Sequence, residues 1–215
     1  MISKNEFEVL VYLTECETIP AQRIIAEVTK LSLGTVNKII QTMTEQGFID
    51  DNEVTKEGYE ALEPYRVKRA VFLAAGFGSR MVPVTLNTPK PLVRVKGKRI
   101  IDTLLDAVSA AGIEEVVLVR GYLGEQFDQL HYKYPNIKFV ENPSYNEANN
   151  ISSAMCVRHL LQNAYVLEAD LVLSNPKLIR KYEYQTNFLG VPEESDSLDM
   201  DAGEAEEQND NGDEV

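Results

Sequence analysis

An apolar run that passes directly into a glycine-rich loop is the feature that most constrains the fold of this chain. Residues 70–75 are all apolar, which is typical of a strand buried on both faces of a parallel sheet. The loop that follows contains Gly76 and Gly78, which lack Cβ, permit positive φ and let backbone N–H groups turn toward an anion. We therefore expect an α/β fold with an anion site at the end of this strand.

Two cations follow the loop at short range in the sequence. Arg80 lies near the end of LAAGFGSRM and Lys90 lies within TPKPL, so both can neutralise a triphosphate. The loop is not a GxGxxG dinucleotide loop, because Met81 replaces the third glycine, and no Lys-Ser or Lys-Thr pair closes it as in a Walker loop. The alternative interpretation is a tight strand-to-helix turn with basic residues on its surface. The two motifs together favour a triphosphate site.

A carboxylate pair follows a second apolar run. Residues 165–167 are apolar and lead into Glu168 and Asp170, so Asp170 is expected at the carboxyl end of a central strand, where open α/β sheets bind ligands. Mg²⁺ prefers one or two carboxylates together with phosphate oxygens and water, so Asp170 is a candidate magnesium ligand. A helix N-cap or a solvated strand end is the alternative for Asp170, and Glu168 either faces the site or points to solvent.

The motifs resemble those of a known superfamily. LAAGFGSRM at 73–81 with TPKPL at 88–92 resembles the signature of nucleoside-triphosphate transferases. EEVVLVRGY, ENPSYNEANNISSA and YVLEADLVL resemble, in the same order, successive blocks of bacterial CTP:phosphocholine cytidylyltransferases. The resemblance covers about residues 68–190. It implies a nucleotide-diphospho-sugar transferase-like fold, which is a Rossmann-like three-layer α/β sandwich.

The resemblance also implies roles for individual residues. Arg80, Lys90 and Asp170 would be catalytic, with Asp170 holding Mg²⁺. The nucleotide-binding residues would be Ala74, Ala75, Gly76, Gly78, Ser79, Arg80, Lys90, Gly121, Tyr122, Asn149, Asn150 and Ser152. From the residues alone, a tyrosine after a strand such as Tyr122 more often packs than binds a ligand. Asn149, Asn150 or Ser152 is equally explained by capping of the helix that follows.

The implied reaction is the transfer of CMP, or another nucleoside monophosphate, from CTP or another NTP to phosphocholine, with release of pyrophosphate. A sugar 1-phosphate is the main alternative acceptor. The blocks that bind the acceptor in this family are not found after Gly190, so we expect a truncated transferase domain at 67–192. The non-enzyme alternative is a regulator in which this domain senses a nucleotide and an N-terminal winged helix acts on DNA or a partner.

The N-terminal segment, residues 1–66, has the pattern of a small helical domain. Helices are expected around 7–13, 24–28 and 36–43, with Ser32 as the N-cap of the third helix, Gly47 as its stop and a hairpin over 48–55. LSLGTVNKIIQTMTEQGFI followed by VTKEGYEAL resembles the winged helix-turn-helix of MarR-like regulators. Such domains read DNA or serve as interaction modules.

Charge separates these alternatives. The net charge of −13 is uneven: residues 1–66 hold 6 basic and 12 acidic side chains, residues 67–192 hold 15 and 11, and residues 193–215 hold 0 and 11. A net basic transferase segment suits a polyanionic nucleotide, whereas an acidic winged helix disfavours DNA binding and favours an interaction module, with which a homodimer is compatible. The acidic tail at 193–215 is expected to be disordered. With no signal peptide or membrane span in the sequence, we expect a cytoplasmic protein without a membrane partner.

The same patterns predict the elements of the transferase segment. Strands are expected near 69–74, 92–95, 115–119, 137–140 and 165–169. Helices are expected near 100–111, 124–132 and 151–162, packed on the faces of the sheet.

Overall fold

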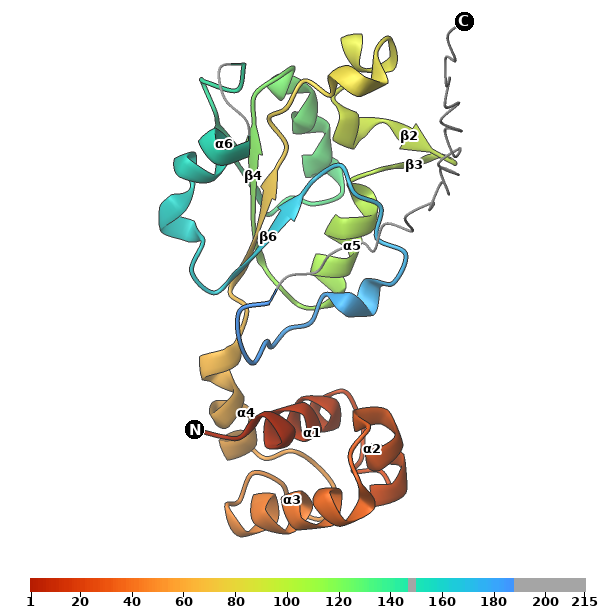
Figure 1. The fold of residues 1–215 in the computed structure, drawn as a ribbon, viewed down its shortest axis with the longest axis vertical. Helices are drawn as coiled ribbons and strands as arrows, with labels where there is room; N and C mark the ends of the chain where they lie inside the picture. Colours follow the sequence, from red (N-terminus) through yellow and green to blue (C-terminus); the bar gives the residue numbers. More distant parts are fainter. Residues whose placement is uncertain (147–149, 188–215) are drawn as a thin grey trace, which may run out of the picture. The chain divides into compact units, whose positions relative to one another are not determined.

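A four-stranded parallel sheet forms the centre of the transferase segment (Figure 1). The computed structural model describes residues 1–146 and 150–187. The strands are β1 (Arg69–Leu73), β4 (Glu115–Arg120), β5 (Ile137–Glu141) and β6 (Ala164–Glu168). Their order in the sheet is β5-β4-β1-β6, and every neighbouring pair is parallel. The chain therefore builds outward from β1 to β5 and then returns to place β6 on the other side of β1, which makes the β1/β6 boundary the topological switch point of this sheet.

Both faces of the sheet are covered, which explains the continuous apolar run of β1. Ala70 and Phe72 belong to the core on one face, together with residues of α5 (Asp102–Ala110). Val71 belongs to the core on the opposite face, with Val157 just beyond α6 (Asn150–Cys156). Figure 1 shows α5 and α6 on opposite sides of the strands. The three-layer α/β sandwich expected from the sequence is confirmed.

Of the elements expected in the transferase segment, several are confirmed and three differ. The expected strand at 92–95 is wrong for the main sheet: β2 (Arg94–Val95) pairs only with β3 (Lys98–Arg99), in a separate antiparallel hairpin. Its turn contains Lys96 and Gly97, both with positive φ, so a tight turn ends the strand after two residues. The segment Gly124–Tyr132 is a 3-10 helix, η5, and the helix expected at 151–162 ends at Cys156 before a 3-10 turn at Arg158–Leu160.

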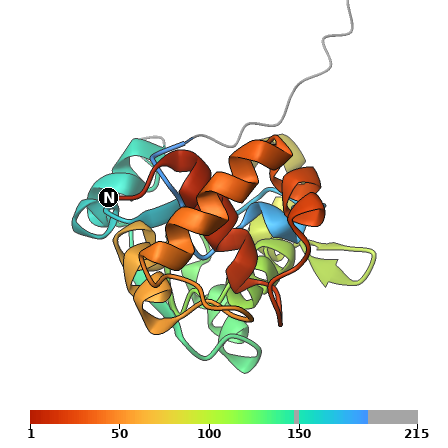
Figure 2. The ribbon, with the colours of Figure 1, turned by 90° about the horizontal axis from the view of Figure 1, so that it is seen from below.

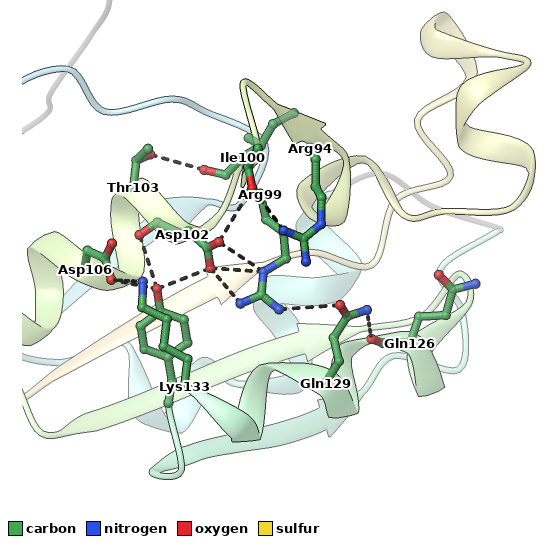
Figure 3. Close-up of polar contacts among 11 residues, drawn as sticks. Arg94, Arg99, Ile100, Asp102, Thr103, Asp106, Gln126, Gln129 and Lys133 are labelled. Atoms are coloured by element: carbon green, nitrogen blue, oxygen red, sulfur yellow. Dashed lines mark hydrogen bonds and ion pairs between the residues drawn. The ribbon is translucent and has the colours of Figure 1, made fainter.

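A cluster of polar side chains fixes the start of α5 (Figure 3). The guanidinium of Arg99 lies 2.9 Å from a carboxylate oxygen of Asp102, and both side chains are only 9% exposed. Arg99 reaches Gln129 of η5 at 3.5 Å, and the Tyr134 hydroxyl donates to Asp106 at 2.7 Å and to Asp102 at 3.2 Å. β3, α5 and η5 are thereby tied together by one buried group of charges.

The charges in this cluster perturb one another. Burial opposes ionisation of Asp102, but hydrogen bonds and the positive charge of Arg99 outweigh it and hold the pKa of Asp102 below its usual value. Burial raises the pKa of the Tyr134 hydroxyl, and the carboxylate of Asp106 adds to this rise. Asp102 is therefore ionised and Tyr134 is neutral near neutral pH, which suits an acceptor and a donor, respectively.

The N-terminal residues form a winged helix-turn-helix, as expected. Its helices are α1 (Lys4–Thr14), α2 (Gln22–Thr29), α3 (Leu33–Glu45) and α4 (Lys56–Leu62). Figure 2 looks onto this region, with α3 (orange) running across the view. The expected cap is confirmed, because the Ser32 side chain accepts a hydrogen bond from the backbone N–H of Thr35. The expected hairpin is reduced to a single bridge between Ile49 and Val54.

Glycine is required where the wing meets α4. A Cβ on Gly58 would lie 2.3 Å from the carbonyl oxygen of Phe48, a distance that a side chain does not tolerate. The backbone at Phe48 therefore packs directly against the backbone of α4. This close approach explains the glycine in the KEGYEAL stretch, which the sequence alone left without a role.

The core of the winged helix includes residues from the far end of the described chain. Tyr182 is buried in this core, and the ring of Tyr184 stacks on that of Tyr65 with 5.4 Å between centroids. The backbone pairs here as well, because Glu183 N–H donates to the carbonyl of Tyr65 and Val67 N–H donates to that of Lys181. The segment after β6 thus contributes Tyr182 to the core of the winged helix and Ile179 to the core on the α5 face of the sheet.

Candidate functional site

The conformation of the loop after β1 depends on Gly78, a position where a side chain would be strained. Gly78 has φ of +69°, and a Cβ there would approach the Cβ of Lys90 and the methyl group of Thr85 at 3.2 Å. The buried hydroxyl of Thr85 donates to the carbonyl of Gly78 at 2.9 Å and fixes this turn. Gly76 differs, because nothing lies within 4 Å of the position that its Cβ would take. The two glycines therefore do different things: Gly78 closes the turn, and Gly76 leaves open space in front of the backbone.

This loop forms one wall of a cavity of about 300 Å³ at the carboxyl ends of β1 and β6. The cavity is lined by Leu73, Ala74, Gly76, Gly78, Ser79, Arg80, Met81, Lys90, Pro91, Glu168 and Asp170. We call it the phosphate-loop pocket. It lies at the switch point of the sheet, where a ligand site is expected on topological grounds.

Lys90 and Asp170 meet directly in the phosphate-loop pocket. Lys90 Nζ donates to a carboxylate oxygen of Asp170 at 2.5 Å, although the two residues are 80 positions apart in the chain. Asp170 is positioned by Ala169, whose N–H donates to the carbonyl of Leu73 at 3.2 Å and holds the segment after β6 against the end of β1. Lys90 opens the 3-10 turn Lys90–Leu92 and is followed by the buried Pro91. Both charges therefore extend from a fixed backbone.

The remaining charged groups of the pocket are Arg80 and Glu168. Arg80 is exposed in the 3-10 turn Ser79–Met81, on the same wall as the glycine loop. Glu168 is the last residue of β6 and lines the pocket, so it faces the site rather than solvent alone. Two cations beside two carboxylates suit a ligand that combines phosphate groups with a divalent cation.

The donor set fits Mg²⁺ held together with a nucleotide. Within residues 1–146 and 150–187, no group of three or more His, Cys, Asp and Glu side chains could hold a metal ion. Asp170 and Glu168 supply carboxylate oxygens, which Mg²⁺ prefers, and this ion commonly completes its coordination with phosphate oxygens and water. The residues present therefore suit a Mg²⁺ that binds through Asp170 and the phosphates of a ligand.

Not every expected nucleotide-binding residue lines this pocket. Ala75, Gly121, Tyr122 and Ser152 lie outside its lining. A Cβ on Gly121 would lie 2.6 Å from the Cβ of Tyr145, so this glycine permits a close approach between two loops. The Asn149 assignment falls outside the described residues, and α6 begins at Asn150.

Tyr122 ties the end of β4 to the glycine loop. Its N–H donates to the carbonyl of Ala75 at 3.1 Å, and its hydroxyl donates to the carbonyl of Leu86 at 2.9 Å. The ring of Phe77 meets that of Tyr122 edge to face, with 4.5 Å between centroids. In this structure Tyr122 supports the loop, which agrees with the packing interpretation of its position. Neither Phe77 nor Thr85 was expected from the sequence, since their contacts are long-range and no local pattern marks them.

Ser152 has a similar supporting position. Its hydroxyl accepts a hydrogen bond from the side-chain amide of the buried Asn142 at 2.9 Å, and Ser153 accepts another from the same amide at 3.1 Å. Asn142 follows β5, so this contact joins the end of that strand to α6. Ser152 therefore links the end of β5 to α6, outside the lining of the phosphate-loop pocket.

Comparison with known proteins agrees with the observed fold. Residues 70–185 match the MobA-like NTP transferase domain, and residues 2–50 match a winged helix-turn-helix DNA-binding family. The 2-aminoethylphosphonate cytidylyltransferase of Lancefieldella rimae is 41% identical over 123 residues, which are 56% of this chain and 50% of that protein. The choline-phosphate cytidylyltransferase of Streptococcus pneumoniae is 42% identical over 102 residues, which are 47% of this chain and 44% of that protein.

A solved structure is similar as well. The CTP:phosphocholine cytidylyltransferase from Streptococcus pneumoniae superposes with a TM-score of 0.51 and 40% identity, over 54% of this chain and 50% of that one. The chain spans about half the length of the curated relatives it matches. Within the described residues, no helix is both long and apolar enough to cross a bilayer. With more than half of its residues matching, and with the parallel sheet and glycine loop in place, the chain belongs to the MobA-like NTP transferase domain family.

Proposed function

We propose that this protein transfers CMP from CTP to a phosphorylated acceptor and releases pyrophosphate. The observation that carries the proposal is the convergence of Arg80, Lys90 and Asp170 in the phosphate-loop pocket. The names of the similar proteins support it, because several of them are cytidylyltransferases. Phosphocholine is the acceptor we favour, and a sugar 1-phosphate is the alternative, in line with the 34% identical mannose-1-phosphate guanyltransferase of Schizosaccharomyces pombe.

In the proposed reaction an oxygen of the acceptor's phosphate attacks the α-phosphorus of CTP. A new P–O bond forms, the bond between the α-phosphorus and the bridging oxygen to the β-phosphate breaks, and pyrophosphate leaves with that electron pair. The attacking oxygen is already anionic, so charge neutralisation and alignment matter more than a general base.

The residues of the pocket divide this work. The backbone N–H groups of the glycine loop would hold the nucleotide phosphates, and Arg80 would stabilise the negative charge that develops on pyrophosphate. Lys90 would stabilise charge on the α-phosphate and the incoming acceptor. Asp170 would hold Mg²⁺, which neutralises phosphate charge and orients the reactants when it is bound.

The test is pyrophosphate release by the purified chain with Mg²⁺ and CTP. Phosphocholine, 2-aminoethylphosphonate and glucose 1-phosphate are supplied in separate reactions, and Asp170→Asn serves as the inactive control. Pyrophosphate release that depends on phosphocholine supports the favoured acceptor. Release only with glucose 1-phosphate would instead identify a sugar 1-phosphate as the acceptor. Absence of release with every acceptor, from a protein that still binds CTP, would favour a nucleotide-sensing regulator.

The winged helix is proposed to bind a protein rather than DNA. The exposed face of α3 carries Asn37, Lys38 and Gln41, which are side chains that can read base edges. However, the wing tip carries Asp50, Asp51 and Glu53, which would face phosphates in a bound duplex. We expect no duplex binding even at low salt, and affinity that appears at low salt and falls steeply as salt rises would contradict this proposal.

A further inference from the structure

The contact between Lys90 and Asp170 joins two groups that the proposed reaction assigns to different ligands. Lys90 is assigned to nucleotide phosphates and Asp170 to a divalent cation, yet here Lys90 Nζ lies 2.5 Å from the Asp170 carboxylate. We propose that Lys90 competes with the divalent cation for Asp170, so that the cation binds well only after nucleotide phosphates have drawn Lys90 away. This inference rests on the proposed function and adds a binding order to it.

The contact is built into the pocket rather than being an incidental surface pair. Ala169, just before Asp170, is buried and hydrogen-bonded to β1. On the other side, Pro91 and Leu92 are buried immediately after Lys90. The backbone on both sides is therefore held, and each side chain reaches into the same pocket. The Lys90 and Asp170 side chains remain 27% and 31% exposed, so a ligand can reach both of them.

The electrostatic consequence follows from the sign of each charge. A divalent cation at Asp170 gains the attraction of one carboxylate but meets the positive charge of Lys90 beside it. Glu168 and Arg80 are the other charged groups of the pocket, and they contribute one negative and one positive charge. Without a polyanion, the cations in the pocket therefore offset the carboxylates that a metal ion needs.

A triphosphate changes this balance. Its oxygens offer Lys90 a more highly charged partner than one carboxylate, and they offer the metal ion additional ligands. Moving Lys90 from Asp170 to a phosphate exposes the carboxylate at the moment when those ligands arrive. Because such coupling is reciprocal, the metal ion must then raise the affinity for CTP by the same factor by which CTP raises the affinity for the metal ion.

The test measures Mn²⁺ binding by the full chain without nucleotide, by electron paramagnetic resonance of the free ion. Lys90→Met removes the charge and keeps most of the side-chain length, so we expect it to bind Mn²⁺ about tenfold more tightly than the wild type. Lys90→Arg keeps the charge and should bind Mn²⁺ like the wild type. Asp170→Asn, alone or with Lys90→Met, should abolish the binding.

Lys133→Met is the matched control. It breaks an ion pair of the same kind, Lys133 with Asp106 at 2.6 Å, but neither residue lines the phosphate-loop pocket. We expect no change in Mn²⁺ affinity from this substitution. A gain equal to that of Lys90→Met would overturn the proposal, because it would reflect net charge alone.

A second measurement covers the nucleotide side. The affinity for CTP is compared with and without Mn²⁺, and the ratio should be larger in the wild type than in Lys90→Met. Unchanged or weaker Mn²⁺ binding by a folded Lys90→Met protein would overturn the inference. This result is separate from a failure of the proposed function, which pyrophosphate release by the wild type measures on its own.

Discussion

Two regions of the transferase segment each contain an aspartate beside a cation, and they differ in how accessible that pair is. At the start of α5, Arg99 and Asp102 are 9% exposed and share further hydrogen bonds with Gln129 and Tyr134. In the phosphate-loop pocket, Lys90 and Asp170 are about three times as exposed and have one short contact. Burial with additional partners makes the first pair part of the fold, whereas access leaves the second pair free to exchange partners with a ligand.

Breaking the buried pair should have the largest effect on stability. Asp102→Ala leaves the Arg99 charge buried without its carboxylate, which is expected to lower the free energy of unfolding by about 3–5 kcal/mol. Urea unfolding of the purified variant measures this loss. The exposed pair of Lys133 and Asp106 gives the control, because Lys133→Ala should cost less than about 1 kcal/mol. Equal losses of unfolding free energy in the two variants would contradict the distinction between the buried pair and the exposed pair.

Breaking the accessible pair should act on turnover instead of stability. Lys90→Ala removes a cation from the phosphate-loop pocket, so kcat for pyrophosphate release should fall by about 10²–10³-fold. Because the pair is partly exposed, the urea midpoint should stay close to that of the wild type. A variant that kept near-full activity, or that lost activity only because it unfolded, would contradict the assignment of Lys90.

The two glycines of the loop sharpen the comparison at a smaller scale. Gly78→Ala places a side chain at positive φ and 3.2 Å from two neighbours, which should cost about 1–2 kcal/mol of stability. Gly76→Ala adds its methyl group to open space and should leave the unfolding free energy almost unchanged. Thermal unfolding of both variants decides the matter, and the prediction is wrong if Gly76→Ala is the more destabilising.

The smallest predicted effect is a change in the stability contribution of Asp102 that occurs only at acidic pH. The pKa of Asp102 is held below its usual value of 3.8, so its contribution to stability is present above that pH and is lost as pH falls through the lower, folded-state pKa. The difference in unfolding free energy between wild type and Asp102→Asn should therefore be constant near neutrality and shrink in strong acid. Urea unfolding at a series of pH values measures it, and a difference that grew on acidification would show that the sign is wrong.

The central sheet could be predicted from the sequence because its residues are constrained on both faces. The run from Ala70 to Ala75 has no polar position, and the structure buries it between two layers of helices. The glycine loop and its cations were predicted by their order after this strand. Their convergence on Asp170 came from the position of that residue after another apolar run, since parallel strands end at one edge of a sheet.

What could not be predicted depends on contacts between distant residues. Lys90 and Asp170 were assigned to one site, but nothing local indicated that they touch. Thr85 contacts Gly78 only because the chain folds back, and Arg99 of β3 contacts Gln129 of η5 only in the folded chain, because 30 positions separate them. The short β2/β3 hairpin was missed because a turn at Lys96 and Gly97 outweighs the apolar run before it.

The packing of Tyr182 and Tyr184 into the winged helix has a consequence for synthesis of the chain. Glu8 and Arg180 form an ion pair although 172 positions separate them. The ring of Phe7 likewise contacts that of Tyr184, near the end of the described chain. A ribosome has to complete every strand of the central sheet before it delivers these partners. The helices of the winged helix are therefore synthesised first but complete their core packing only after Arg180, Tyr182 and Tyr184 have been synthesised. By then, translation has also passed every residue that lines the phosphate-loop pocket.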